Sequence, residues 1–129
     1  MMKHEQPVIS WFELPVNDIQ RAKRFYETIF DMEMELLDLG EQFKMAVFPG
    51  GQSAVGGALV YNEAFYKSSQ THGPLLHLNA NPDLEIVQNR IEEAGGSVTI
   101  PKRGIGPGRG FMAVFVDTEG NRVALHSDA

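Results

Sequence analysis

The residues of this chain that could do chemistry are histidines, carboxylates and a cationic loop. The 129 residues include four histidines and no cysteine. A metal would therefore need His, Asp or Glu ligands, because thiolates are absent. No Ser or Thr is placed with a His in a recognisable nucleophile motif, so the sequence does not indicate covalent catalysis by a hydroxyl group.

The cationic loop is the segment 102–110, which is rich in glycine and contains Lys102, Arg103 and Arg109. One interpretation is that it closes over an anionic substrate, with Arg103 or Arg109 binding a carboxylate by a two-pronged contact. A solvated connector is the alternative interpretation. The glycines do not follow a strand and open a helix, so the segment does not match a phosphate-binding loop.

The elements that must position these residues follow an order that occurs twice. Alternating apolar residues predict strands, and apolar residues at helical spacing predict helices. The first half reads strand, helix, strand, strand, strand over 8–16, 19–29, 33–39, 43–48 and 57–61. The second half reads in the same order over 75–80, 84–94, 97–100, 111–116 and 122–126. This repeat predicts one α+β domain over 1–129, with two tandem βαβββ modules at about 7–62 and about 73–127.

Composition excludes some classes of binding partner and indicates a cellular compartment. The net charge is −6 and there is no run of Lys and Arg, so nucleic acid is not an expected partner. No apolar run approaches the roughly 18 residues that span a bilayer, and the polar N-terminus lacks the apolar core of a secretory signal. We therefore expect a cytoplasmic protein without a membrane partner.

Motifs in both halves resemble one superfamily. Phe12-Glu13-Leu14-Pro15-Val16 with Asp18, Arg21-Ala22 and Phe25-Tyr26 is similar to the opening strand and helix of vicinal oxygen chelate proteins. Ala94-Gly95-Gly96, and then Asp117 with Glu119-Gly120-Asn121, is similar to the second module of these proteins. The superfamily includes glyoxalases, bleomycin-resistance proteins and extradiol dioxygenases. The resemblance implies a cup of curved mixed sheet that binds a small molecule, often over a divalent metal, and a homodimer.

The usual metal ligands of the superfamily are missing from this chain. Counting from the landmarks places these positions at Trp11, Ala58, Leu75 and Ala124. None of these side chains can bind a metal. This counts against a typical glyoxalase I activity.

Two residues further along three of these strands, the side chains can bind a metal. A shift of two keeps the same face of a strand and moves about 6.6 Å along it. It leads to Glu13, His77 and His126. Two His and one carboxylate match a facial triad for Fe and also suit Zn, Mn or Ni. Glu13 is then also the candidate catalytic residue, and a metal-free polar cluster at the base of the cup is the alternative.

Aromatic side chains are candidates for the wall of the cup. Trp11, Phe43, Phe111 and Phe115 lie on predicted strands, although aromatics at strand spacing also form ordinary cores. An apolar pocket with a few convergent polar groups is typical of small-molecule sites. The expected substrate-binding residues are therefore Trp11, Arg103, Arg109 and Phe111.

Three functions remain open from the sequence. One is a metal-dependent lyase, isomerase or dioxygenase acting on a small oxygenated metabolite. The second is a metal-free protein that binds or sequesters a small aromatic or antibiotic-like molecule. The third is a ligand-sensing module without chemistry. The fold alone does not decide among them, because function depends on the site.

Overall fold

The computed structural model describes residues 7–50, 55–64 and 67–129, and within these ranges the chain forms two four-stranded sheets. The first half contains β1 (Trp11–Pro15), α1 (Ile19–Phe30), β2 (Glu35–Asp38), β3 (Phe43–Val47) and β4 (Gly56–Asn62). The second contains β5 (His77–Asn79), α2 (Leu84–Ala94), β6 (Ser97–Gly104), β7 (Phe111–Val116) and β8 (Arg122–Ser127). Two tandem βαβββ modules confirm the predicted α+β fold. No helix among the described residues is long and apolar enough to cross a membrane.

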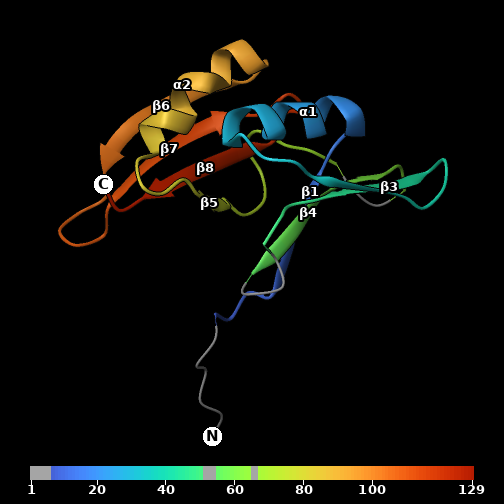
Figure 1. Cartoon of the computed structure of the whole chain (residues 1–129), viewed down its shortest axis with the longest axis horizontal. Coiled ribbons are helices and arrows are strands. Elements are labelled where there is room, and N and C mark those ends of the chain that lie inside the picture. Colours follow the sequence, from blue (N-terminus) through green and yellow to red (C-terminus); the bar gives the residue numbers. More distant parts are fainter. Residues whose placement is uncertain (1–6, 51–54, 65–66) are drawn as a thin grey trace, which may run out of the picture.

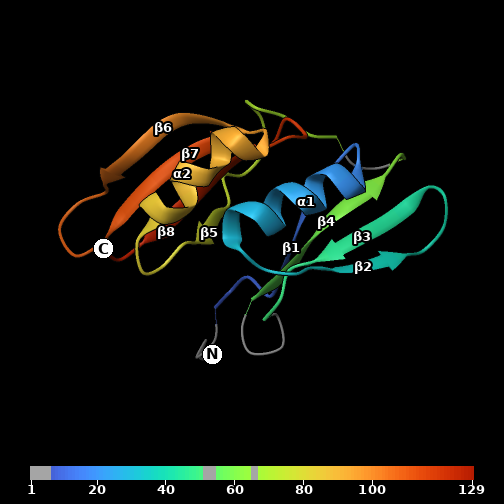
Figure 2. The ribbon, with the colours of Figure 1, turned by 45° about the horizontal axis from the view of Figure 1, so that its top comes forward.

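Both sheets have the same mixed topology. The strand orders are β1-β4-β3-β2 and β5-β8-β7-β6. Strand β1 runs parallel to its neighbour β4, and β5 runs parallel to its neighbour β8. The helices cover the same side of the two sheets (Figure 1). In Figure 2, β1 and β5 lie toward the middle of the molecule, and β2 and β6 lie at its outer edges. The edges of β1 and β5 that carry no neighbouring strand therefore border the region between the modules.

Helix α1 begins and ends at aspartates. The side chain of Asp18 accepts a hydrogen bond from the amide of Arg21 at 3.0 Å, which satisfies one of the unpaired amides of the first turn. Asp31 ends the helix in the left-handed conformation, with φ at 51°. Glycine usually takes this place, and Asp is one of the few other residues that adopt it readily.

The two modules share one apolar core. Phe25 and Tyr26 of α1 are buried, and the Phe25 ring contacts the rings of Tyr26 and Phe115 at centroid distances of 4.9 and 6.0 Å. Phe115 lies on β7 of the second module. Leu84, Val87 and Ile91 of α2 belong to the same cluster of buried residues. Side chains from both halves are therefore buried in the same cluster, which stabilises the contact between the two modules.

A buried carboxylate joins the second module to the start of α1. Glu119 lies in the turn between β7 and β8 and is only 3% exposed. It accepts hydrogen bonds from the backbone amides of Asn17 and Asp18 at 2.9 and 2.8 Å. The guanidinium of Arg21 donates two more, from Nε at 2.7 Å and from Nη2 at 2.9 Å. These charge-assisted bonds are stronger than neutral ones, and the positive end of the helix dipole also favours a carboxylate here.

A second buried carboxylate extends this connection. Asp117 accepts a hydrogen bond from the Tyr26 hydroxyl at 2.8 Å and from the side-chain amide of Asn121 at 3.0 Å. The Asn121 amide also donates to the carbonyl of Pro15, at the end of β1, at 2.7 Å. Burial raises the pKa of Asp117 in spite of these donors. Together with Glu119, Asp117 and Asn121 form the turn contact, the set of bonds that fixes β8 relative to β1.

Strand β6 is longer than the sequence predicts. It continues from Ser97 through Pro101 to Gly104, with irregular register against β7. A proline is tolerated because β6 is an edge strand, where a missing amide donor costs no ladder bond. Lys102 and Arg103 are therefore strand residues, and the glycine-rich loop is confined to 105–110.

Replacing Glu119 with Gln should lower the free energy of unfolding by about 1–3 kcal/mol, because the donors of these part-buried bonds lose their charged acceptor. Denaturant unfolding at neutral pH measures this change. Glu93→Gln is the matched control, because Glu93 is exposed on α2. It removes the same charge and should shift stability by less than about 0.5 kcal/mol. Equal effects of the two substitutions would contradict the structural role of Glu119.

The contribution of Glu119 should also depend on pH. Burial alone would raise the pKa of this carboxyl, but the bonds from Arg21 and the other donors outweigh burial and hold its pKa below the ordinary value. Stability from a depressed pKa is fully present above the unfolded pKa and is lost as the pH falls through the folded pKa. The stability gap between the parent and Glu119→Gln should therefore shrink in acid, and a constant gap would count against this account.

Candidate functional site

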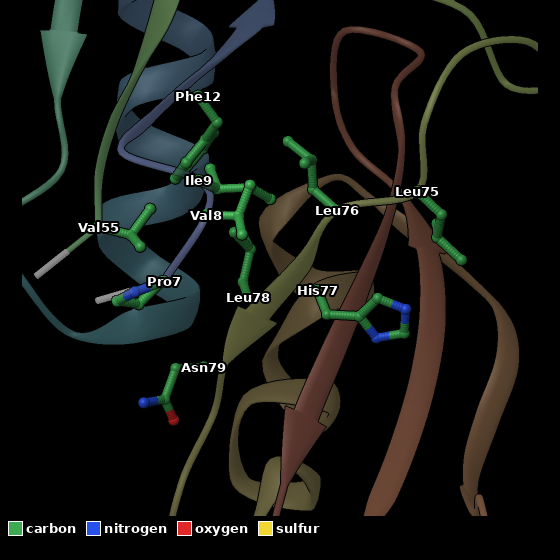
Figure 3. Close-up of a pocket in the computed structure, with 10 residues that line it drawn as sticks. All are labelled: Pro7, Val8, Ile9, Phe12, Val55, Leu75, Leu76, His77, Leu78 and Asn79. Carbon is green, nitrogen blue, oxygen red and sulfur yellow. The ribbon is translucent and has the colours of Figure 1, made fainter. Parts of the chain in front are cut away.

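A hollow lies between the inner edges of the two sheets. It has a volume of about 590 Å³ and is bordered by the chain around β1 and by the chain around β5. Its walls are mainly apolar: Pro7, Val8, Ile9, Phe12, Val55, Leu75, Leu76, His77, Leu78 and Asn79. Figure 3 shows Leu76 and Leu78 pointing toward Val8 and Ile9, on the other side of this space. We call it the apolar hollow.

The apolar hollow leaves large apolar side chains in contact with solvent. Val8 and Ile9 are 87% and 55% exposed. Single exposed apolar residues are common, but a concave cluster of them is typical of a binding surface. The hollow therefore offers a small molecule an apolar wall that the fold has already formed.

Phe12 lines the apolar hollow from β1. Its ring packs against Phe48 at a centroid distance of 5.6 Å. It also lies directly over Gly57 of β4, where an added Cβ would overlap the ring. Gly57 thus lets Phe12 lie flat on the sheet, and any side chain at this position would push the ring toward the hollow.

A second, smaller hollow lies beside the first and contains charged groups. It has a volume of about 330 Å³, and its walls include Glu13, Lys67, His72 and Arg122. Phe12 and Leu76 line this hollow as well as the apolar hollow. We call it the charged hollow.

Glu13 and Arg122 in the charged hollow have defined partners. The indole nitrogen of Trp11 donates to Glu13 Oε2 at 3.1 Å. Arg122 donates from Nη2 to the carbonyl of Gly73 at 3.1 Å. Its Nε is buried, and no described group accepts a hydrogen bond from it. Arg122 therefore brings an unused donor to this part of the site.

His77 and His126 lie on one face of the second sheet. The pairing of His77 with Ala124 and of Asn79 with His126 places the two histidines on the same side of neighbouring strands. In Figure 3 the His77 ring points away from Leu76 and Leu78, over the adjacent strand. Burial, and next the charge of His126, lower the pKa of His77. His77 is therefore a neutral imidazole at neutral pH, able to accept a hydrogen bond.

The other predicted substrate-binding residues lie outside both hollows. Trp11 lines a separate surface depression with Glu33 and Glu35. Phe111 packs against the core, and Lys102 Nζ lies 4.6 Å from the centre of its ring. Arg109 meets His126 through its backbone carbonyl, 2.8 Å from Nε2. Arg103 is exposed on β6. Their role in binding a substrate stays a prediction.

The sequence interpretation missed residues that line the hollows. Phe12, Leu76 and Leu78 read as ordinary strand residues, and Arg122 follows the motif that ends at Asn121 without being part of it. A signal was present only in the alternation of Leu76, His77 and Leu78, which predicts that the two leucines share a face. The position of β5 beside β1 comes from tertiary structure, and no local pattern reports it.

A family model identifies the protein family of this chain. The model of the Glyoxalase/Bleomycin resistance protein/Dioxygenase superfamily matches residues 8–125, which is nearly the whole chain. The chain belongs to this superfamily. The match confirms the predicted resemblance. No curated protein matches the sequence.

Solved structures with the fold of this superfamily member include both small proteins and larger enzymes. A glyoxalase/bleomycin resistance protein from a Streptomyces species is 25% identical, with a TM-score of 0.61, coverage of 91% of this chain and 97% of that one. One from Albidiferax ferrireducens is 15% identical, with a TM-score of 0.67 and coverage of 95% and 100%. Glyoxalase I from Zea mays is 22% identical, with a TM-score of 0.70 and coverage of 92% and 45%. This superfamily member thus spans less than half of the maize chain.

The structure also bears on the metal that proteins of this superfamily often use. Among the residues that the structure describes, no group of three or more His, Asp or Glu side chains could hold a metal ion. Glu13 lines the charged hollow, whereas His77 lines the apolar hollow. The predicted triad of Glu13, His77 and His126 is therefore not assembled within the described part of one chain. The residues present do not fit the predicted site, and a divalent metal stays a prediction for this superfamily member.

Metal content tests this finding directly. With two neighbouring histidines and no third ligand beside them in the described part of the chain, protein purified without chelator should contain well below one Fe, Mn, Ni or Zn per chain by plasma mass spectrometry. Exposed His72 gives the control variant His72→Ala, beside His126→Ala. Near-stoichiometric metal that is lost in His126→Ala and kept in His72→Ala would contradict this expectation and establish a metal site at His126.

Proposed function

We propose that this protein binds a small oxygenated metabolite in the apolar hollow between β1 and β5. The observation that carries the proposal is the hollow of about 590 Å³ between the modules, whose walls are mainly apolar. Pockets of this size, with few polar groups among apolar walls, are typical of small-molecule sites. Membership of the superfamily supports the same class of ligand.

The polar groups of the apolar hollow indicate how an oxygenated ligand would be oriented. His77 and Asn79 are exposed and lie on one face of β5. A neutral imidazole accepts a hydrogen bond from a hydroxyl group, and the Asn amide both donates and accepts. Hydroxyl and carbonyl groups are thus matched at the rim of the hollow, while the body of the ligand contacts apolar side chains.

Metal-dependent lyase, isomerase or dioxygenase chemistry is the second candidate. It is favoured by His77 and His126, which share one face of the second sheet. It would need a third ligand that one described chain does not bring to them. Binding or sequestration without chemistry, or ligand sensing, needs only the hollow. A homodimer is part of the proposal because the superfamily commonly forms one.

Binding of an uncharged apolar probe tests the proposed site. N-phenyl-1-naphthylamine should bind in the apolar hollow with a rise in fluorescence. Ile9→Asp should weaken this binding by about tenfold or more, because a charge replaces apolar contact area. Ile86→Asp is the matched control, since Ile86 is 51% exposed on α2, outside the hollow, and it should leave the affinity unchanged.

Two outcomes would contradict the proposed site. Absence of saturable probe binding to the parent protein would remove the apolar hollow as a site. Equal loss of affinity in Ile9→Asp and Ile86→Asp would place the probe elsewhere or indicate a general effect of charge. Thermal unfolding of both variants checks that they fold, which we expect because both positions are exposed.

A further inference from the structure

We propose that the ligand is an amphipathic organic anion, with its apolar body in the apolar hollow and its carboxylate in the charged hollow beside Arg122. This inference rests on the proposed function and adds the chemical class of the ligand. It assigns recognition of the anionic group to the segment 67–73 and to the start of β8, instead of the glycine-rich loop.

Continuity of the two hollows is the first observation. Phe12 and Leu76 line both of them, so a ligand in contact with these side chains lies at the boundary of the two spaces. The apolar hollow contains no Lys or Arg among its described lining residues, whereas the charged hollow contains both. The site therefore changes from apolar to cationic along its length. This order matches a ligand with an apolar body and an anionic head group.

Local charge is the second observation. Lys67 and Arg122 carry two fixed positive charges in the charged hollow, and Glu13 contributes one negative charge. One oxygen of Glu13 already accepts a hydrogen bond from Trp11. The balance of these fixed charges favours one monovalent anion. The whole chain has a net charge of −6, so its overall electric field repels an anion. Only local positive groups can hold one.

The unused donor of Arg122 is the third observation. Nη2 is bonded to the carbonyl of Gly73, while the buried Nε has no acceptor among the described groups. A buried donor without a partner is unfavourable. Nε has almost no accessible surface, so the rest of the Arg122 guanidinium, in a residue that lines the charged hollow, would contact an anionic oxygen. Arg122 is held in place by Gly73 before any ligand binds. It is therefore preorganised to bind a carboxylate.

Displacement of the fluorescent probe distinguishes this inference from the proposed function. Octanoate and octanamide share the same apolar chain and differ mainly in the charge of the head group. With the probe bound to the parent protein, octanoate should compete at about tenfold lower concentration than octanamide, as expected for one charge-assisted contact. The ratio should fall at high salt, because part of the attraction is screened.

Arg122→Gln should reduce this ratio to about one while the affinity for the uncharged probe stays the same. Lys67→Gln, at an exposed position, should reduce the ratio in part, and it tests the inference even if Arg122→Gln fails to fold. Arg24→Gln is the control because Arg24 is exposed on α1, and it should keep the ratio of the parent.

Equal competition by octanoate and octanamide would overturn the anionic class while leaving the apolar site intact. A ratio that survives in both Arg122→Gln and Lys67→Gln would overturn the assignment to the charged hollow. Weaker probe binding in Arg122→Gln, with the ratio of the parent retained, would show that this arginine supports the fold and does not bind the carboxylate. Failure of the probe to bind the parent protein would remove the proposed function itself, which is a separate result.

Discussion

The carboxylate of Glu119 is the contact on which the arrangement of the two modules depends. It lies in a turn of the second module and accepts hydrogen bonds from two amides at the start of α1 in the first. The side chain of Arg21 is 47% exposed and that of Glu119 is fully buried. Water weakens the ion pair at such a half-exposed site, so the two backbone amides at the start of α1 are the partners that Glu119 holds in addition to the exposed guanidinium. A residue of another shape or charge could not satisfy them together.

This turn contact also sets the position of the site. Asn121 bonds to the carbonyl of Pro15 at the end of β1, and Arg122 begins β8 one residue later. The charged hollow thus lies directly beside the bonds that hold the modules together. The shared aromatic core of Phe25, Tyr26 and Phe115 supports them from the helix side. The part of the charged hollow around Pro15, Asn121 and Arg122 is therefore held in place before a ligand binds, which reduces the ordering cost of binding.

The fold followed from the sequence because its signals are local and occur twice. Alternation and helical spacing predicted α1 and the strands around it, and Asp18 and Asp31 cap α1 in the structure. The site did not follow as well. Counting by two keeps a residue on its face within one strand, so His77 and His126 do share a sheet face. The same count gives no distance across the two separate sheets, and Glu13 lies in a different hollow from His77.

The length and sequence of β1 and β5 explain why the region between them stays open. Two free strand edges would ordinarily pair with each other or with another chain. Here β5 has only three residues, and β1 ends at Pro15. Proline has no backbone N–H to donate to a neighbouring strand. The side chains of Phe12, Leu76 and Leu78 occupy the space between the edges. These features prevent one continuous sheet and leave apolar side chains where a ladder would otherwise run. The same short strand and proline that weaken the sheet therefore create the space that a small molecule can fill.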